Sequence, residues 1–172
     1  MAEKERHNLY IDIAARVAEE SHARRLKVGS IIVKEGRIIS MGWNGMPSGW
    51  DNTCENIQWM EDAGGWLSPE EIAEQWPFEG IYMDSSGEEY VSRYKLVTKP
   101  EVLHAESNAI AKLAKSTESG AGADLYITLS PCIDCAKLIH QTGIKNVYYR
   151  DDYRKDDGIK FLEKSNIKVQ KL

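Results

Sequence analysis

The side chains best suited to chemistry lie in two short segments, one with a histidine and a glutamate and the other with two cysteines. They are His104-Ala105-Glu106 and Pro131-Cys132-Ile133-Asp134-Cys135. One imidazole and two thiolates can hold a zinc ion and leave its fourth position open for water. The start of a helix favours thiolate, and two cysteines spaced three residues apart lie on one helix face. We therefore predict one catalytic zinc ion per chain, held by His104, Cys132 and Cys135.

Glu106 has a separate predicted role. It follows His104 by two positions, so on a regular helix its side chain does not share the face of the histidine. A fourth metal ligand is therefore not expected at this position. A carboxylate beside a zinc-activated water can take a proton from it and deliver that proton elsewhere. Glu106 is the predicted catalytic residue.

The Cys-x-x-Cys pair has two other interpretations. It could be a redox pair, since placement at a helix start suits that chemistry as well. It could also be half of a structural zinc site, but such a site needs four protein ligands and Cys54 is the only spare cysteine. A redox pair does not require the His-x-Glu segment, so the sequence favours the open catalytic site.

Composition narrows the class of protein. The 172 residues fit a single domain spanning the whole chain. A net charge of −5 and a pI near 5.5 argue against a nucleic-acid polymer as partner. Three cysteines make a poor disulfide framework and indicate a reducing compartment. The charged N-terminus does not resemble a signal peptide, and no apolar run is long enough to cross a membrane. We expect a cytoplasmic protein without a membrane partner.

Alternating helix-like and strand-like segments must position these residues. Residues 9–22 have helical periodicity, and Glu35-Gly36 is a hairpin signal between two β-branched runs. Ser130 and Pro131 are expected to cap and begin the helix that carries the cysteines. The predicted strands are 28–34, 37–43, 125–129, 145–149 and 167–169, and the later helices are 104–115, 131–141 and 157–164. This order predicts an α/β layered fold with a mixed sheet, antiparallel in its first half and parallel in its second.

Residues 50–100 read as an irregular, tryptophan-rich insertion. Four of the five tryptophans lie between Trp50 and Trp76, and they are expected to form a core of their own. Ser68-Pro69-Glu70-Glu71 predicts a short helix with a capping box, and residues 84–89 predict an exposed turn.

Two further features suggest ligand contacts. Residues 42–49 contain three glycines and one proline, which allows either close approach of a ligand or simply a turn-rich loop. Arg25, from an arginine pair before the first strand, is a candidate phosphate ligand, although most such pairs are solvated.

The motifs resemble a known family. His-x-Glu followed by Pro-Cys-x-x-Cys is the pattern of zinc nucleobase deaminases. With Val28-Gly29 and the segments 42–49, 104–110 and 128–137, the chain resembles deoxycytidylate (dCMP) deaminases, including those of phages, over about residues 9–60 and 100–170. The resemblance implies a three-layer α/β/α sandwich around a five-stranded mixed sheet, assembled as a homo-oligomer, often a hexamer. It implies loss of ammonia from C4 of dCMP, giving dUMP for thymidylate synthesis.

Residue roles also follow from the resemblance alone. Asn44 would bind the sugar, the backbone at Ala105 the pyrimidine, the Ser130 region the leaving amino group, and Arg25 and Tyr153 the phosphate. The family implies activation by dCTP and inhibition by dTTP, with Mg²⁺ on the triphosphate. The residues implied for that effector site are Gly42, Asn44, Gly45, Met46 and Gly49.

The chain departs from the family pattern at Trp43, where the family usually has tyrosine. Few spare ligands remain, so the second, structural zinc of some phage relatives is not expected. Alternative functions are deamination of free cytidine or of a cytosine or adenine base in nucleic acid, and a non-catalytic zinc module that senses nucleotides. If the source is viral, the expected location is the host cytoplasm.

Overall fold

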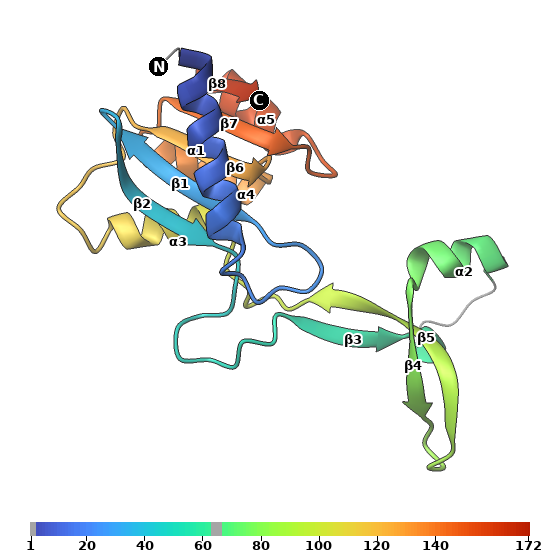
Figure 1. The fold of residues 1–172 in the computed structure, drawn as a ribbon. Coiled ribbons are helices and arrows are strands. Elements are labelled where there is room, and N and C mark those ends of the chain that lie inside the picture. The colour runs from blue at the N-terminus through green and yellow to red at the C-terminus, as the bar shows by residue number, and fades with distance from the viewer. Residues whose placement is uncertain (1–2, 63–66) are drawn as a thin grey trace.

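Two separate sheets organise the part of the chain that this computed structural model describes, residues 3–62 and 67–172. One sheet lies inside a layered body, and the other forms an arm that projects from it (Figure 1). The elements in chain order are α1 (Glu3–Ala18), β1 (Gly29–Lys34), β2 (Arg37–Trp43), β3 (Glu55–Trp59), η1 (Met60–Asp62), α2 (Pro69–Gln75), β4 (Phe78–Met83), β5 (Glu89–Thr98), α3 (Ala105–Leu113), β6 (Asp124–Leu129), α4 (Ile133–Gln141), β7 (Asn146–Asp151), α5 (Asp157–Lys164) and β8 (Lys168–Lys171).

The body contains a five-stranded sheet in the order β2-β1-β6-β7-β8. β1 pairs antiparallel with both β2 and β6, whereas β6, β7 and β8 are parallel. The predicted mixed sheet is therefore confirmed, with the hairpin at one edge and the parallel strands at the other. The first helix was predicted at residues 9–22 but spans Glu3–Ala18. It ends early because the chain turns at residues 19–20, and the hydroxyl of the next residue, Ser21, donates to the Asn44 carbonyl.

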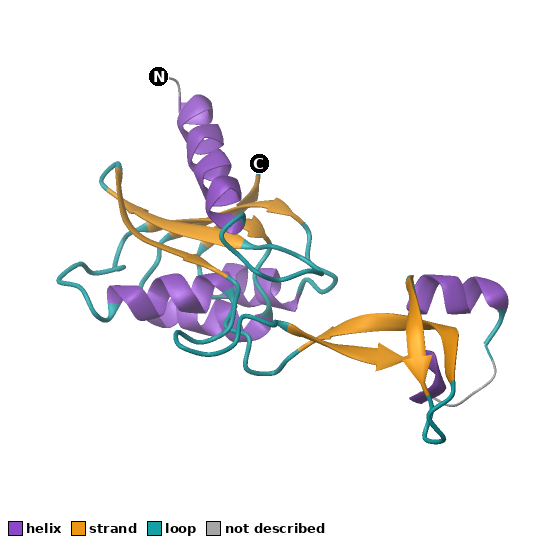
Figure 2. Ribbon diagram, turned by 60° about the horizontal axis from the view of Figure 1, so that its bottom comes forward, coloured by secondary structure: helices purple, strands orange, loops and turns teal. Residues whose placement is uncertain are grey.

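Strand alternation divides the core into two layers. Ile31, Tyr126 and Tyr148 face α1, while their neighbours Ile32, Leu125 and Val147 pack against α3, α4 and α5. Figure 2 shows α1 on one side of the sheet and the three later helices on the other. This is the predicted α/β/α sandwich, and it places the helices that carry both chemical motifs in the same layer.

Two glycines allow helices to approach the sheet closely. A Cβ on Gly29 would lie 2.2 Å from the Ala14 carbonyl oxygen of α1, and one on Gly42 would lie 2.4 Å from the Ala105 carbonyl oxygen of α3. Either added carbon would overlap backbone that cannot yield locally. The start of α3, which carries a motif, is thus fixed by the absence of a side chain at Gly42.

The arm is ordered, whereas the sequence suggested an irregular segment. Its sheet has the order β3-β5-β4, and α2 begins with the predicted capping box between Ser68 and Glu71. Trp59 packs edge-on against tyrosines of the arm, and Trp76 is buried. Trp50, by contrast, is 57% exposed, and Trp66 lies outside the described residues, so the predicted tryptophan core is only partly present.

None of the described helices combines the length and the apolar character that a membrane span requires.

Candidate metal centre and pocket

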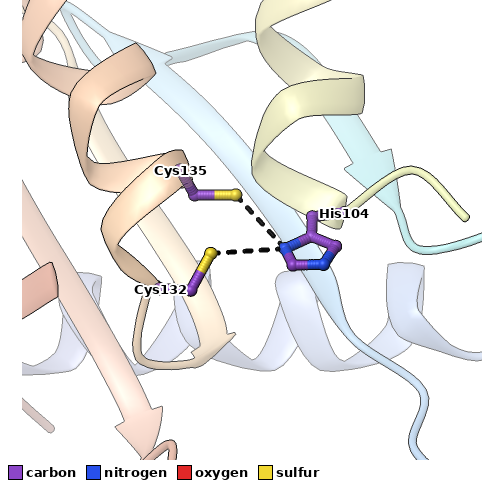
Figure 3. Close-up of side chains that lie close together, drawn as sticks. All are labelled: His104, Cys132 and Cys135. Atoms are coloured by element: carbon purple, nitrogen blue, oxygen red, sulfur yellow. Dashed lines mark hydrogen bonds between the residues drawn. The ribbon is translucent and has the colours of Figure 1, made fainter. Parts of the chain in front are cut away.

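The starts of two helices bring the predicted metal ligands together. His104 is the N-cap of α3, and Cys132 is the N-cap of α4. His104 Nδ1 lies 3.5 Å from Cys132 Sγ and 3.4 Å from Cys135 Sγ (Figure 3). The ligand atoms of all three residues lie within 4.8 Å of one another. Two soft thiolates and one imidazole at this separation fit a tetrahedral zinc ion with one open position.

The structure corrects how the second helix begins. Ser130 and Pro131 were expected to start it, but the chain stays extended through Cys132 and helix α4 begins at Ile133. The Ser130 hydroxyl instead accepts the backbone N–H of Tyr153 at 2.7 Å. The serine of the Ser-Pro pair therefore does not cap the helix; it connects the loop before α4 to the loop after β7. The extended conformation at Cys132 places its thiol at the open end of the helix, facing His104.

The protonation of the two thiols is linked. A hydrogen bond from Cys135 lowers the pKa of Cys132 to about 4. The same bond, together with burial, raises the pKa of Cys135. A hydrogen bond with Cys132 also raises the pKa of His104. Two neighbouring thiols lose both protons only beside additional positive charge, so this donor set suits a divalent cation.

Glu106 lies in the first turn of α3 and is only 4% exposed. Burial raises the pKa of its carboxyl to about 7. Most exposed glutamates are fully ionised at neutral pH, whereas this one can hold or release a proton there. A group with that property beside a metal cluster is suited to general acid–base catalysis.

A pocket of about 650 Å³ opens beside the cluster. His104, Glu106 and Cys132 contribute to its wall. All five residues to which the family resemblance assigned substrate contacts also line it, namely Arg25, Asn44, Ala105, Ser130 and Tyr153. Five predicted residues from separate stretches of the sequence therefore line one pocket.

One wall of the pocket consists of residues that were not predicted from the sequence. Glu55, Val97, Thr98, Lys99 and Pro100, all at the root of the arm, line it together with the body residues. Their contribution depends on the pairing of β3 with β5, whose partners lie about forty residues apart in the chain. No motif marks these positions, and only the long-range pairing could have indicated them.

Asn44 supports the pocket as well as lining it. Its Oδ1 accepts the N–H of Val28 at 2.8 Å, and its Nδ2 donates to the carbonyl of Leu26 at 2.9 Å. Each amide atom still has capacity for one further hydrogen bond. Asn44 thus fixes the loop before β1 and can also contact a ligand.

The residues of the glycine-rich loop, 42–49, have different surroundings and different structural roles. Gly42 is buried, and close packing on α3 explains why a glycine is required there. Gly49 has φ of +88° in open surroundings, which explains that glycine by backbone conformation. Gly45 forms a two-bond bridge with Leu103, directly before the metal ligand His104. Met46 packs on the small cluster of Ala23, Cys54 and Val102. Of the five residues predicted for an effector, Gly42 is the one that is closed to contact.

A three-layer sandwich in which two helix starts converge on a His/Cys/Cys cluster beside a buried glutamate defines a metal-binding α/β protein with a hydrolytic type of site. A model of the cytidine and deoxycytidylate deaminase zinc-binding region matches residues 4–151. The chain therefore belongs to the cytidine and deoxycytidylate deaminase family, and the cluster provides ligands for the zinc of that family.

Relatives with curated names agree with this assignment. The deoxycytidylate deaminase of Enterobacteria phage T2 is 40% identical over 154 residues, covering 85% of this chain and 80% of the relative. That of Enterobacteria phage T4 is 38% identical over 154 residues, covering 85% of this chain and 78% of the relative. A crystal structure of the dCMP deaminase from cyanophage S-TIM5 in complex with dCMP and dUMP superposes with a TM-score of 0.75 at 37% identity, covering all of both chains.

Proposed function

We propose that this protein hydrolyses dCMP to dUMP and ammonia. The observation that carries the proposal is the buried Glu106 beside the three-ligand cluster, at the wall of a pocket that also presents Arg25. Support comes from the phage relatives named deoxycytidylate deaminase and from the related cyanophage enzyme bound to dCMP and dUMP. The pathway role would be supply of dUMP for thymidylate synthesis.

The chemistry divides between the metal and the chain. Zinc held by His104, Cys132 and Cys135 would supply Lewis acidity and activate the hydrolytic water. The Glu106 carboxylate would take one proton from that water and place it on N3 of the pyrimidine. The water oxygen would bond to C4, and Glu106 would carry the second proton of that water to the exocyclic nitrogen. The C4–N bond would then break, so that ammonia leaves and a C4=O group remains. Burial favours the protonated form of this carboxyl, so it can hold the proton that it takes from water until it delivers it.

The remaining pocket residues would select the nucleotide. Asn44 would contact the sugar, the Ala105 backbone the pyrimidine edge, and Ser130 the departing amino group. Arg25 and Tyr153 would hold the 5′-phosphate, and Arg25 suits this role because guanidinium binds phosphate with two parallel hydrogen bonds. All five residues line the same pocket as the metal cluster, which supports these assignments.

Regulation by dCTP as activator and dTTP as inhibitor, with Mg²⁺ on the triphosphate, is part of the proposal. The loop of residues 42–49 would bind the effector through Asn44, Gly45, Met46 and Gly49. The Gly45–Leu103 bridge supports coupling, because a shift of the loop would act on the residue next to His104.

We also propose that the chain is one deaminase domain with the arm as an insertion, and that it assembles as a homo-oligomer, with a hexamer expected. The arm has exposed apolar side chains: Ile81 is 67%, Met83 60% and Val91 73% exposed. Residues 55–98 carry ten acidic and two basic side chains, so the rest of a chain of net charge −5 is +3. An acidic arm and a basic remainder favour contact between copies. The protein would act in the cytoplasm, that of the host if it is viral.

Ammonia release from dCMP, deoxycytidine and a cytosine-containing oligonucleotide tests the function. We expect turnover of dCMP well above that of the other two, stimulated by dCTP and reduced by dTTP. Preference for the nucleoside or the oligonucleotide would support another deaminase. Nucleotide binding without ammonia release would support a sensing module.

A further inference from the structure

Glu55 is a buried acid whose position needs an explanation. It is the first residue of β3, lines the pocket and is only 6% exposed. Its Oε1 accepts the backbone N–H groups of Arg24 at 2.9 Å and Arg25 at 3.1 Å. Its Oε2 has no hydrogen-bond partner among the described residues. An unpaired buried carboxylate oxygen destabilises a fold, so packing alone does not account for a glutamate here.

The strand partner of Glu55 contacts the same arginine. Glu55 lies opposite Thr98 in the β3–β5 ladder. The Thr98 hydroxyl accepts a hydrogen bond from Arg25 Nη1 at 3.1 Å. The two residues of one cross-strand pair therefore contact Arg25 at two places. Glu55 binds its backbone N–H, and Thr98 binds its guanidinium group.

We propose that the Glu55–Thr98 pair positions Arg25 for the substrate phosphate and so determines the preference for a nucleoside monophosphate over a nucleoside. This inference rests on the proposed function. An unrestrained arginine loses side-chain freedom when it binds phosphate, whereas one already held loses less. Glu55 and Thr98 are positioning residues in this arrangement, and Arg25 is the group that touches the ligand.

Steady-state kinetics with dCMP and deoxycytidine test the proposal. In Glu55→Ala, we expect KM for dCMP to rise about tenfold with kcat retained, which is the effect of one lost charge-assisted contact. The kcat/KM for deoxycytidine should not change, because that substrate has no phosphate. Glu55→Gln keeps an oxygen that can accept the two N–H groups, so it should restore most of the preference. An equal loss in the Gln and Ala variants would overturn the proposal.

Thr98→Val tests the second contact with little change in shape. It removes only the hydroxyl that meets Arg25, and we expect about a fivefold rise in KM for dCMP. Glu79→Ala is the matched control, since this exposed arm glutamate pairs with Arg93 and does not line the pocket. No change is expected in that variant.

A double-mutant cycle separates positioning from a general structural role. Once Arg25→Ala is present, adding Glu55→Ala should cause no further loss of dCMP preference. Additive losses, or equal losses for dCMP and deoxycytidine, would overturn the inference. Absence of ammonia release from dCMP by the wild-type protein would instead refute the proposed function. In that event the dissociation constants of dUMP for the same variants, measured by calorimetry, would still test the positioning role.

Discussion

At the scale of single residues, the proposed site separates the three side chains that would bind the metal from the one that would transfer protons. Two helix starts bring together His104, Cys132 and Cys135. Glu106 lies in the first turn of α3, two residues after His104, and is buried. The sequence predicted that the His, Cys and Cys side chains would cluster because residue type, spacing and helix geometry are local properties. The proton-transfer role of Glu106 stays a prediction. The altered pKa of Glu106 depends on burial, and burial depends on the complete fold.

Replacement of Glu106 by glutamine tests the division directly. The amide keeps the shape of the side chain but cannot carry a proton, so turnover should fall by about 10²- to 10⁴-fold. Zinc content, measured by metal analysis, should stay at one ion per chain. Retained activity would exclude the proton-transfer role, and loss of zinc would show that the carboxylate is itself a ligand.

The thiols give the complementary prediction. Cys135→Ala should lose zinc and activity together, because a buried ligand is removed from the three-residue cluster. Cys54→Ala is the matched control: Cys54 is also buried, but it packs with Ala23 and Val102 and should leave the zinc content unchanged. Removal of zinc from the wild-type protein by a chelator should abolish ammonia release, and added Zn²⁺ should restore it. Zinc loss in the Cys54 variant would contradict the assignment.

At the scale of elements, close packing of the helices on the sheet determines where the site residues lie. Gly29 and Gly42 lie on neighbouring strands and meet α1 and α3 respectively. Gly42→Ala and Gly29→Ala should each lower the free energy of unfolding by about 1–3 kcal/mol through overpacking, as measured by denaturant titration. Only Gly42→Ala should also weaken zinc binding, since α3 carries His104. Equal zinc affinities in the two variants would show that the position of α3 does not control the metal centre.

Local patterns predicted the body elements well because its central strands β1, β6 and β7 are apolar runs that are largely buried. Two regions were harder to predict, the start of α4 and the strands of the arm. The Ser130-Pro131 signal is a strong local helix start, yet the Tyr153 N–H takes the serine hydroxyl and Cys132 becomes the N-cap. The strands of the arm were missed because their side chains are partly exposed on both faces, which leaves no apolar periodicity, and because β3 and β5 are distant in sequence.

At the scale of the whole molecule, the arm joins the pocket to a potential interface. Its root lines the pocket through Glu55 and Thr98, while its far end presents Ile81 and Val91 opposite each other in the β4–β5 ladder. A two-stranded ribbon with exposed apolar side chains is only marginally stable in water. Contact with another copy would stabilise it.

Charge at the far end of the arm tests that contact. If copies associate there, Val91→Asp should reduce the oligomeric mass measured by size-exclusion chromatography with light scattering, because burying an unpaired charge is unfavourable. Ser85→Ala, in the exposed turn beyond β4, serves as control and should leave the mass unchanged. An unaltered mass in the aspartate variant would place the interface elsewhere on the molecule.

The uneven distribution of tryptophan has a spectroscopic consequence. Four of the five indoles belong to residues 50–76. Among the described residues, Trp59 and Trp76 lie in the arm and Trp50 lies in the segment before it, whereas Trp43 lies on β2 of the body. Tryptophan fluorescence, excited selectively at long ultraviolet wavelength, will therefore report chiefly on the arm and on the segment that leads to it. Far-ultraviolet circular dichroism will instead be dominated by the helices of the body. The two optical signals can be followed in one titration, and any separation between them would reveal whether the projection melts independently of the fold that carries the zinc ligands.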